Sequence, residues 1–195
     1  MIVYKILMGV SMERRKKVSI LFFASSFVIF GLSALSHFLY KWSGYNGFVG
    51  IFAPTNESVF QHIKMFFYPT ILYYFFIFFI FGKKYDLNAN KWYIAPLITV
   101  LLTSAIVISM YYTTRFGFNI ESMFIDIASL FLGLFISSMI CKSIYKSRRM
   151  VNFPSYVLVV ILLIMTISVA YYDANPKEID LFYDHQNNTY YEVKD

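Results

Sequence analysis

The chain has 195 residues, of which 58% are hydrophobic, 21% aromatic and only 14% charged. A soluble domain carries about a quarter charged residues, so this composition excludes a soluble protein and a large extramembrane enzyme domain. The net charge of +6 comes from basic residues grouped between apolar runs, a pattern that favours membrane orientation over nucleic-acid binding.

Five apolar stretches are long enough to cross a membrane at about 20 residues each. They predict an all-α polytopic membrane protein, because a backbone in lipid must satisfy its own hydrogen bonds and does so in helices. We expect one domain over residues 1–195, a single transmembrane bundle. In chain order, the predicted spans are residues 17–40, 59–81, 92–112, 120–140 and 153–172.

Two segments outside the spans have a distinct composition. Residues 41–56 combine Trp42, Tyr45, Phe48 and Phe52 with three glycines, and a water-exposed loop would be less apolar. We therefore expect this segment to be ordered as an apolar cap that packs over the outer helix ends. The tail, residues 173–195, is acidic and is expected on the outer side.

The distribution of basic residues predicts the orientation. With the N-terminus inside, 12 Lys and Arg side chains face the cytoplasm and five face outward, which satisfies the positive-inside rule. The five outward residues are Lys41, Lys64, Arg115, Lys177 and Lys194. Five spans then place the C-terminus outside, and we expect the protein in a bacterial cytoplasmic membrane.

Four strongly polar side chains lie at or within the predicted spans: His37, Glu57, His62 and Asp126. They come from three different spans but share one depth, about 5–10 Å below the outer boundary. Small and hydroxyl residues line the faces that carry His37 and Asp126, which is typical of helix surfaces that pack against protein. The sequence therefore predicts an outward-facing polar pocket within the bundle.

Each of these residues also has a purely structural interpretation. Asn56 is a suitable N-cap for the second span, and Glu57 in the first turn would favour the helix dipole. A hydrogen bond to a neighbouring carbonyl would account for His37. A buried Asp126 needs a partner, and the nearest candidates are Arg115 and the two histidines.

Two chemistries fit the four residues. His37, His62, Asp126 and Glu57 are suitable ligands for a divalent metal such as zinc, with water as a further ligand. Alternatively, a histidine and a carboxylate act as a general base without metal, which makes the same four residues the catalytic candidates. The sequence contains no H-E-x-x-H, G-x-S-x-G or Walker A motif.

Three segments carry a family resemblance: H-F-L-Y-K-W-S-G (37–44), G-I-F-A-P-T-N-E-S-V-F-Q-H-I-K (50–64) and N-P-K-E-I-D-L-F-Y-D (175–184). With these the chain resembles an uncharacterised bacterial family of small multi-pass membrane proteins, domain of unknown function 6512. Its pattern is similar to H-x-x-x-x-W-S-G followed by P-x-N-E-S-V-x-x-H-x-K. The resemblance implies five helices and a signature of Trp42, Asn56, Glu57 and His62, but no activity.

The sequence leaves the function open between two main interpretations. One is a non-enzymatic accessory or assembly role, in which the polar residues only pin the helices. The alternative is a pocket that binds or hydrolyses a lipid or lipid-linked substrate. A path for protons or small solutes is a third hypothesis. The expected partners are the bilayer, a lipid ligand, and a second copy or another membrane protein, but no nucleic acid.

Overall fold

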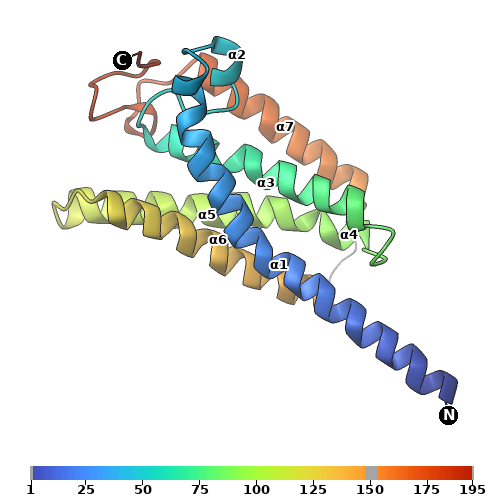
Figure 1. Ribbon diagram of the computed structural model, residues 1–195. Coiled ribbons are helices and arrows are strands. Elements are labelled where there is room, and N and C mark those ends of the chain that lie inside the picture. Colours follow the sequence, from blue (N-terminus) through green and yellow to red (C-terminus); the bar gives the residue numbers. More distant parts are fainter. Residues whose placement is uncertain (1, 148–152, 195) are drawn as a thin grey trace.

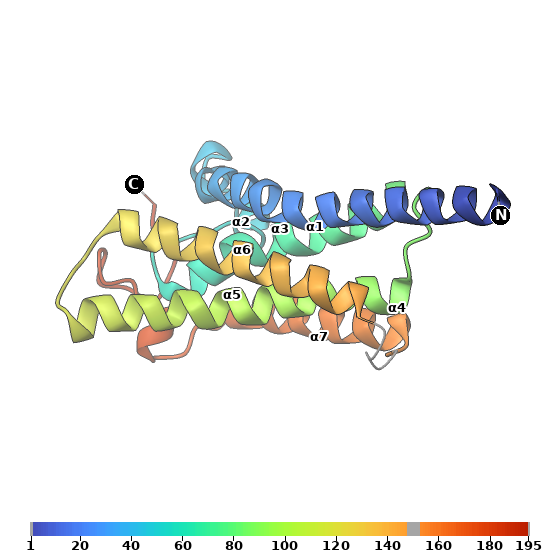
Figure 2. The ribbon, with the colours of Figure 1, turned by 90° about the horizontal axis from the view of Figure 1, so that it is seen from below.

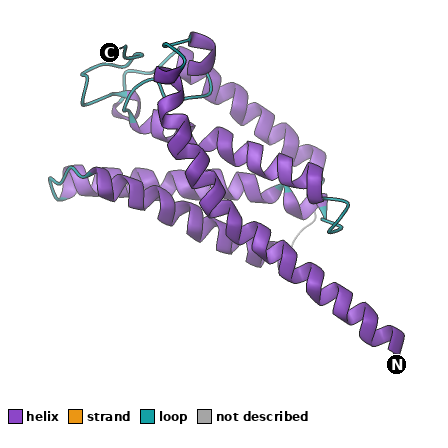
Figure 3. Ribbon diagram, viewed as in Figure 1, coloured by secondary structure: helices purple, strands orange, loops and turns teal. Residues whose placement is uncertain are grey.

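The computed structural model describes residues 2–147 and 153–194, and within these ranges every regular element is a helix (Figures 1 and 3). Five helices are long and apolar enough to cross a membrane, which confirms the predicted all-α polytopic class. They are α1 (Ile2–Trp42), α3 (Val59–Phe81), α5 (Ile94–Tyr112), α6 (Met123–Lys146) and α7 (Ser155–Ala174). The connections contain two one-turn helices, α2 (Gly47–Gly50) and α4 (Ala89–Trp92).

Four of the long helices form a closed bundle. α5 packs against α6, α6 against α1, α1 against α3, and α3 against α5. α7 lies outside this bundle, where Met165 and Val169 pack against Phe67, Tyr68 and Val100. The two ends of the chain lie at opposite ends of the molecule (Figures 1 and 2). We call the end that carries the C-terminal segment the tail end.

The opposite half of the bundle has a dense aromatic core. Phe22, Tyr74 and Trp92 are fully buried and their rings contact one another. The Trp92 indole N–H donates to the Tyr74 carbonyl at 2.9 Å, so the ring satisfies its polar atom within the core. Nearby, α5 and α6 approach so closely that a Cβ on Gly133 would lie 2.9 Å from Thr103 Cγ2. This half of the bundle is therefore tightly packed.

α3 has the predicted bounds, and the other four long helices differ from the predicted spans, most of all at the start of α1 and at both ends of α6. α1 is continuous from Ile2, so the predicted span 17–40 is only part of a longer helix. α6 begins at Met123 and not at residue 120, because a π-helical turn, Thr113–Gly117, and a left-handed Asn119 (φ 54°) redirect the chain before it. Two of the basic residues used to predict the orientation, Arg148 and Arg149, lie outside the described residues.

Residues 41–56 are ordered, but their aromatic side chains do not all pack inward. Trp42 and Phe48 are 66% and 71% exposed, so these two side chains do not pack inward. Tyr45 and Phe52 contact Tyr40 on α1 and Tyr68 on α3, and Gly50 and Ala53 are buried. A Cβ on Gly50 would lie 3.1 Å from Tyr40, so this small residue permits the close approach to α1.

Candidate functional site: a polar pocket at the tail end

The start of α3 determines the position of Glu57. The Ser58 hydroxyl accepts a hydrogen bond from the Gln61 N–H, so Ser58 is the N-cap. The predicted N-cap, Asn56, instead accepts a hydrogen bond from the Ser58 N–H at 3.0 Å. Glu57 therefore precedes the cap and lies outside the first helical turn. The expectation that it lies in the first helical turn is wrong.

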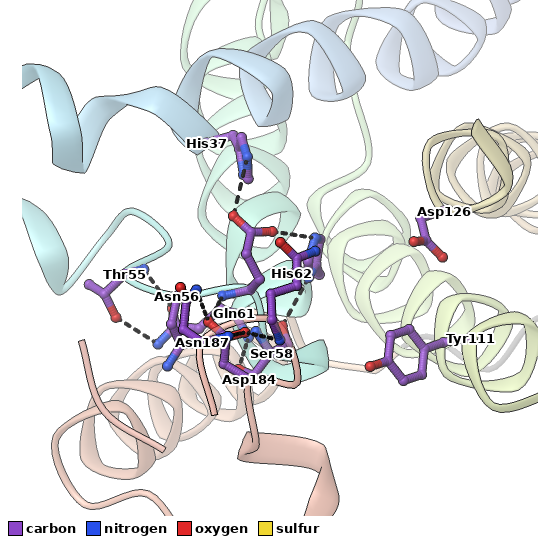
Figure 4. Close-up of polar contacts among 12 residues, drawn as sticks. His37, Thr55, Asn56, Ser58, Gln61, His62, Tyr111, Asp126, Asp184 and Asn187 are labelled. Atoms are coloured by element: carbon purple, nitrogen blue, oxygen red, sulfur yellow. Dashed lines mark hydrogen bonds and ion pairs between the residues drawn. The ribbon is translucent and has the colours of Figure 1, made fainter. Parts of the chain in front are cut away.

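The Glu57 carboxylate contacts two histidines that come from different helices, and Figure 4 shows His37 and His62 on two sides of one group of polar side chains. Its Oε1 is 3.6 Å from His37 Nε2 on α1, and its Oε2 is 3.5 Å from His62 Nε2 on α3. The two imidazole rings are 6.3 Å apart between centroids. Three of the four predicted site residues thus come together, because Glu57 lies before the helix and is free to reach both rings.

The hydrogen bond on the far side of the His62 ring fixes its orientation. His62 Nδ1 lies 2.9 Å from the Ser58 carbonyl oxygen. A carbonyl oxygen only accepts, so Nδ1 carries the hydrogen and donates it. With Nδ1 occupied in this way, Nε2 is the ring nitrogen that faces Glu57.

The fourth predicted residue, Asp126, lies on a different wall. It is in the first turn of α6, and its Oδ2 is 3.4 Å from Arg115 Nη2. Arg115 also donates to the Tyr111 hydroxyl at 2.8 Å, and its guanidinium lies over the Tyr111 ring at 4.2 Å from the centroid. Of the three candidate partners of Asp126, Arg115 is the one that pairs with it. Figure 4 shows Asp126 and Tyr111 set apart from His37 and His62.

These two groups face a common cavity of about 600 Å³. Its ionisable lining residues are His37, Glu57, His62, Arg115, Glu121 and Asp126. Its apolar lining includes Phe30, Met65, Val107 and Leu130, from four different helices. The volume lies in the range of pockets that hold small organic ligands, about 300–1,000 Å³.

The arrangement bears on the metal hypothesis. Within residues 2–147 and 153–194, no group of three or more His, Cys, Asp or Glu side chains is arranged to hold a metal ion. Asp126 pairs with Arg115 on one side of the cavity, whereas Glu57 and the two histidines form another wall. The four residues predicted as ligands are thus not gathered around a single point.

A second polar cluster, which the sequence reasoning missed, lies beside this pocket. The Lys64 side chain is fully buried, and its Nζ is 2.6 Å from Asp173 Oδ1 and 2.7 Å from the Gly50 carbonyl oxygen. Gln61 donates to the same Asp173 oxygen at 2.8 Å. The cluster ties α3 to α7 and to the last residue of α2. The feature of the sequence that could have indicated this cluster is Lys64, the lysine that ends the P-x-N-E-S-V-x-x-H-x-K pattern.

The tail folds back onto the start of α3. Asp184 is fully buried, and its Oδ2 accepts a hydrogen bond from the Glu57 N–H at 2.9 Å. Burial raises the pKa of Asp184, but hydrogen bonds from Asn187, Glu57 and Gln186 outweigh it and hold the pKa below its usual value. Gln186, two residues further on, lines the cavity. The tail therefore positions Glu57 and closes one side of the pocket.

Comparison with known proteins places the chain in a family. The family of unknown function DUF6512 matches residues 10–191, so the chain belongs to this family, and the resemblance seen in the three sequence segments is confirmed. No curated protein and no solved structure matches the chain.

Proposed function

We propose that this member of the family binds an amphiphile, a lipid or a lipid-linked molecule, in the polar pocket at the tail end. The observation that carries the proposal is a gradient of polarity from the tail end of the cavity to its deeper end. Every acidic and basic lining residue lies toward the tail end, where apolar residues such as Phe38, Val59 and Met123 lie among them. The deeper lining is apolar and contains Phe30, Met65, Val107 and Leu130.

This gradient matches the shape of a membrane amphiphile. The helices cross the membrane, so a headgroup at the polar end places its chain against the apolar end, one to two turns deeper. Seven residues of α1 separate His37 from Phe30, a depth of about 10 Å. A water-soluble ligand would gain nothing from the apolar half of the cavity, whereas an alkyl chain would bury its surface there.

An accessory role, in which the polar residues only pin helices together, explains the pocket less well. The contacts of Glu57 with His37 and His62 are 3.5–3.6 Å long, beyond the 2.7–2.9 Å of a strong charge-assisted hydrogen bond. The Lys64–Asp173 pair is short and buried and supplies that pinning instead. This difference supports a binding role for the first group.

We further propose that the tail end faces outward from a bacterial cytoplasmic membrane. Four lysines lie toward the other end of the bundle: Lys17 on α1, Lys142 on α6, and Lys83 and Lys84 in the segment after α3. An excess of Lys and Arg marks the cytoplasmic side of membrane proteins. The pocket would then receive its ligand from the outer leaflet.

The binding proposal is tested by filling the cavity. Ala34 lines it, so Ala34→Phe should exclude an alkyl chain and reduce the lipid that co-purifies with the protein about tenfold, measured by native mass spectrometry. The matched control is Ala128→Phe, an exposed position on α6 outside the cavity lining, which should leave the bound lipid unchanged. Equal lipid retention in both variants would reject the proposal in favour of the accessory role.

A further inference from the structure

The wall formed by Glu57 and His62 presents hydrogen-bond acceptors to the cavity. A carboxylate has no donor. His62 Nδ1 donates its hydrogen to the Ser58 carbonyl oxygen, so in the neutral form of the ring Nε2 carries a lone pair. In that form Nε2 and Glu57 Oε2, 3.5 Å apart, are two acceptors that face each other. Such a pair is satisfied when a group with several N–H donors and a positive charge lies beside it.

The charges that line the rest of the cavity favour the same kind of group. The lining carries three carboxylates, Glu57, Glu121 and Asp126, against one permanent cation, Arg115. Arg115 is already paired with Asp126. The remaining carboxylates give the polar end of the pocket an excess of negative charge, which attracts a cation and repels an anionic headgroup.

From these two observations we propose that the amphiphile carries a primary ammonium in its headgroup, bound between Glu57 and His62. This inference rests on the proposed function and names the chemical class of the ligand. A primary ammonium has three N–H donors, and one nitrogen at about 2.8 Å from each acceptor spans the 3.5 Å between them. A quaternary ammonium has the charge but no donor, so it does not satisfy the acceptors.

The test compares the binding of three dodecyl amphiphiles and one short amine to the purified full-length protein in a neutral detergent. Dodecylamine should bind at least tenfold more tightly than dodecyltrimethylammonium, which has the same charge and chain but no N–H group. Dodecyl phosphate should bind more weakly still. Butylamine should bind far more weakly than dodecylamine, since it lacks the chain that fills the apolar half. These comparisons use the wild-type chain and need no variant to fold.

A pair of variants locates the ammonium. Glu57→Gln should weaken dodecylamine binding about 10–100-fold, the usual effect of losing a charged hydrogen-bond partner. Glu178→Gln, at an exposed position in the tail, should leave it unchanged.

Three outcomes would overturn the inference but leave the pocket proposal standing. The first is equal binding of dodecylamine and dodecyltrimethylammonium, and the second is tighter binding of dodecyl phosphate than of dodecylamine. The third is Zn²⁺ binding that depends on Glu57 in a protein that does not bind dodecylamine. If dodecylamine and butylamine bind equally, the ligand is a small amine and the proposal of an amphiphilic ligand is rejected. If no alkyl probe binds in a manner sensitive to Ala34→Phe, the proposed function itself fails.

Discussion

Glu57 is placed by its neighbours in sequence and by a residue far along the chain. Ser58 begins the helix, so Glu57 stays outside it, and the buried Asp184 accepts the Glu57 backbone N–H. The hydrogen bonds that reach Asp184 also come from the N–H groups of Gln186 and Asn187. One carboxylate in the tail therefore fixes both the tail and the backbone of a pocket residue.

The variant Asp184→Asn tests this role through its dependence on pH. The folded pKa of Asp184 lies below its ordinary value of 3.8, so its stabilising effect is complete above that value and is lost as the pH falls through the folded pKa. At pH 7 the variant should be less stable than the wild type by about 1–3 kcal/mol, because buried donors lose a charged acceptor. As the pH falls through the folded pKa of Asp184, the difference should shrink.

Thermal unfolding of the two proteins at each pH, in the same detergent, makes the measurement. Asn187 also donates from its side chain to Asp184, so Asn187→Ala serves as a control that removes one donor and keeps the carboxylate. An Asp184→Asn penalty that is the same at pH 7 and below the folded pKa would show that the charge of Asp184 contributes nothing.

At the scale of elements, the long helices follow from hydrophobicity but the connections between them do not. Apolar runs of about 20 residues locate the spans within a few residues because lipid demands satisfied backbones there. The bounds fail where local geometry intervenes, as at the left-handed Asn119 before α6. Asp126 consequently sits in the first helical turn, nearer the end of the helix than predicted.

The candidate site was predicted in part for a related reason. A shared depth was the only sequence argument that placed Glu57 with His37 and His62, because the stripes of small residues concerned the faces of His37 and Asp126. It was not sufficient to separate Asp126 from them, because depth says nothing about the distance across a bundle. The Lys64–Asp173 pair was missed because each residue, viewed alone, looks like an ordinary charge near a membrane boundary. The pair forms because α7 packs against α3, and the pattern of apolar runs does not predict which helices pack against each other.

At the scale of the whole molecule, the orientation sets which leaflet the pocket serves. In a Cys141→Ala background, a cysteine at the exposed Glu178 should react with an impermeant thiol reagent added to intact cells. A cysteine at Ser147, at the opposite end of the bundle, should react only after the cells are opened. The reverse pattern would place the tail end in the cytoplasm and refute the outward-facing pocket.

Photo-crosslinking tests most directly whether an alkyl chain enters the cavity within the bundle. Val107 and Leu130 line the cavity but are only 9% and 6% exposed, so lipid that merely surrounds the protein does not reach them. A dodecylamine with a diazirine in its chain should crosslink to these two residues, as mapped by mass spectrometry, and Ala34→Phe should abolish this labelling. Crosslinks confined to outward residues such as Ile164 and Ile167 on α7, 58% and 68% exposed, would contradict the account.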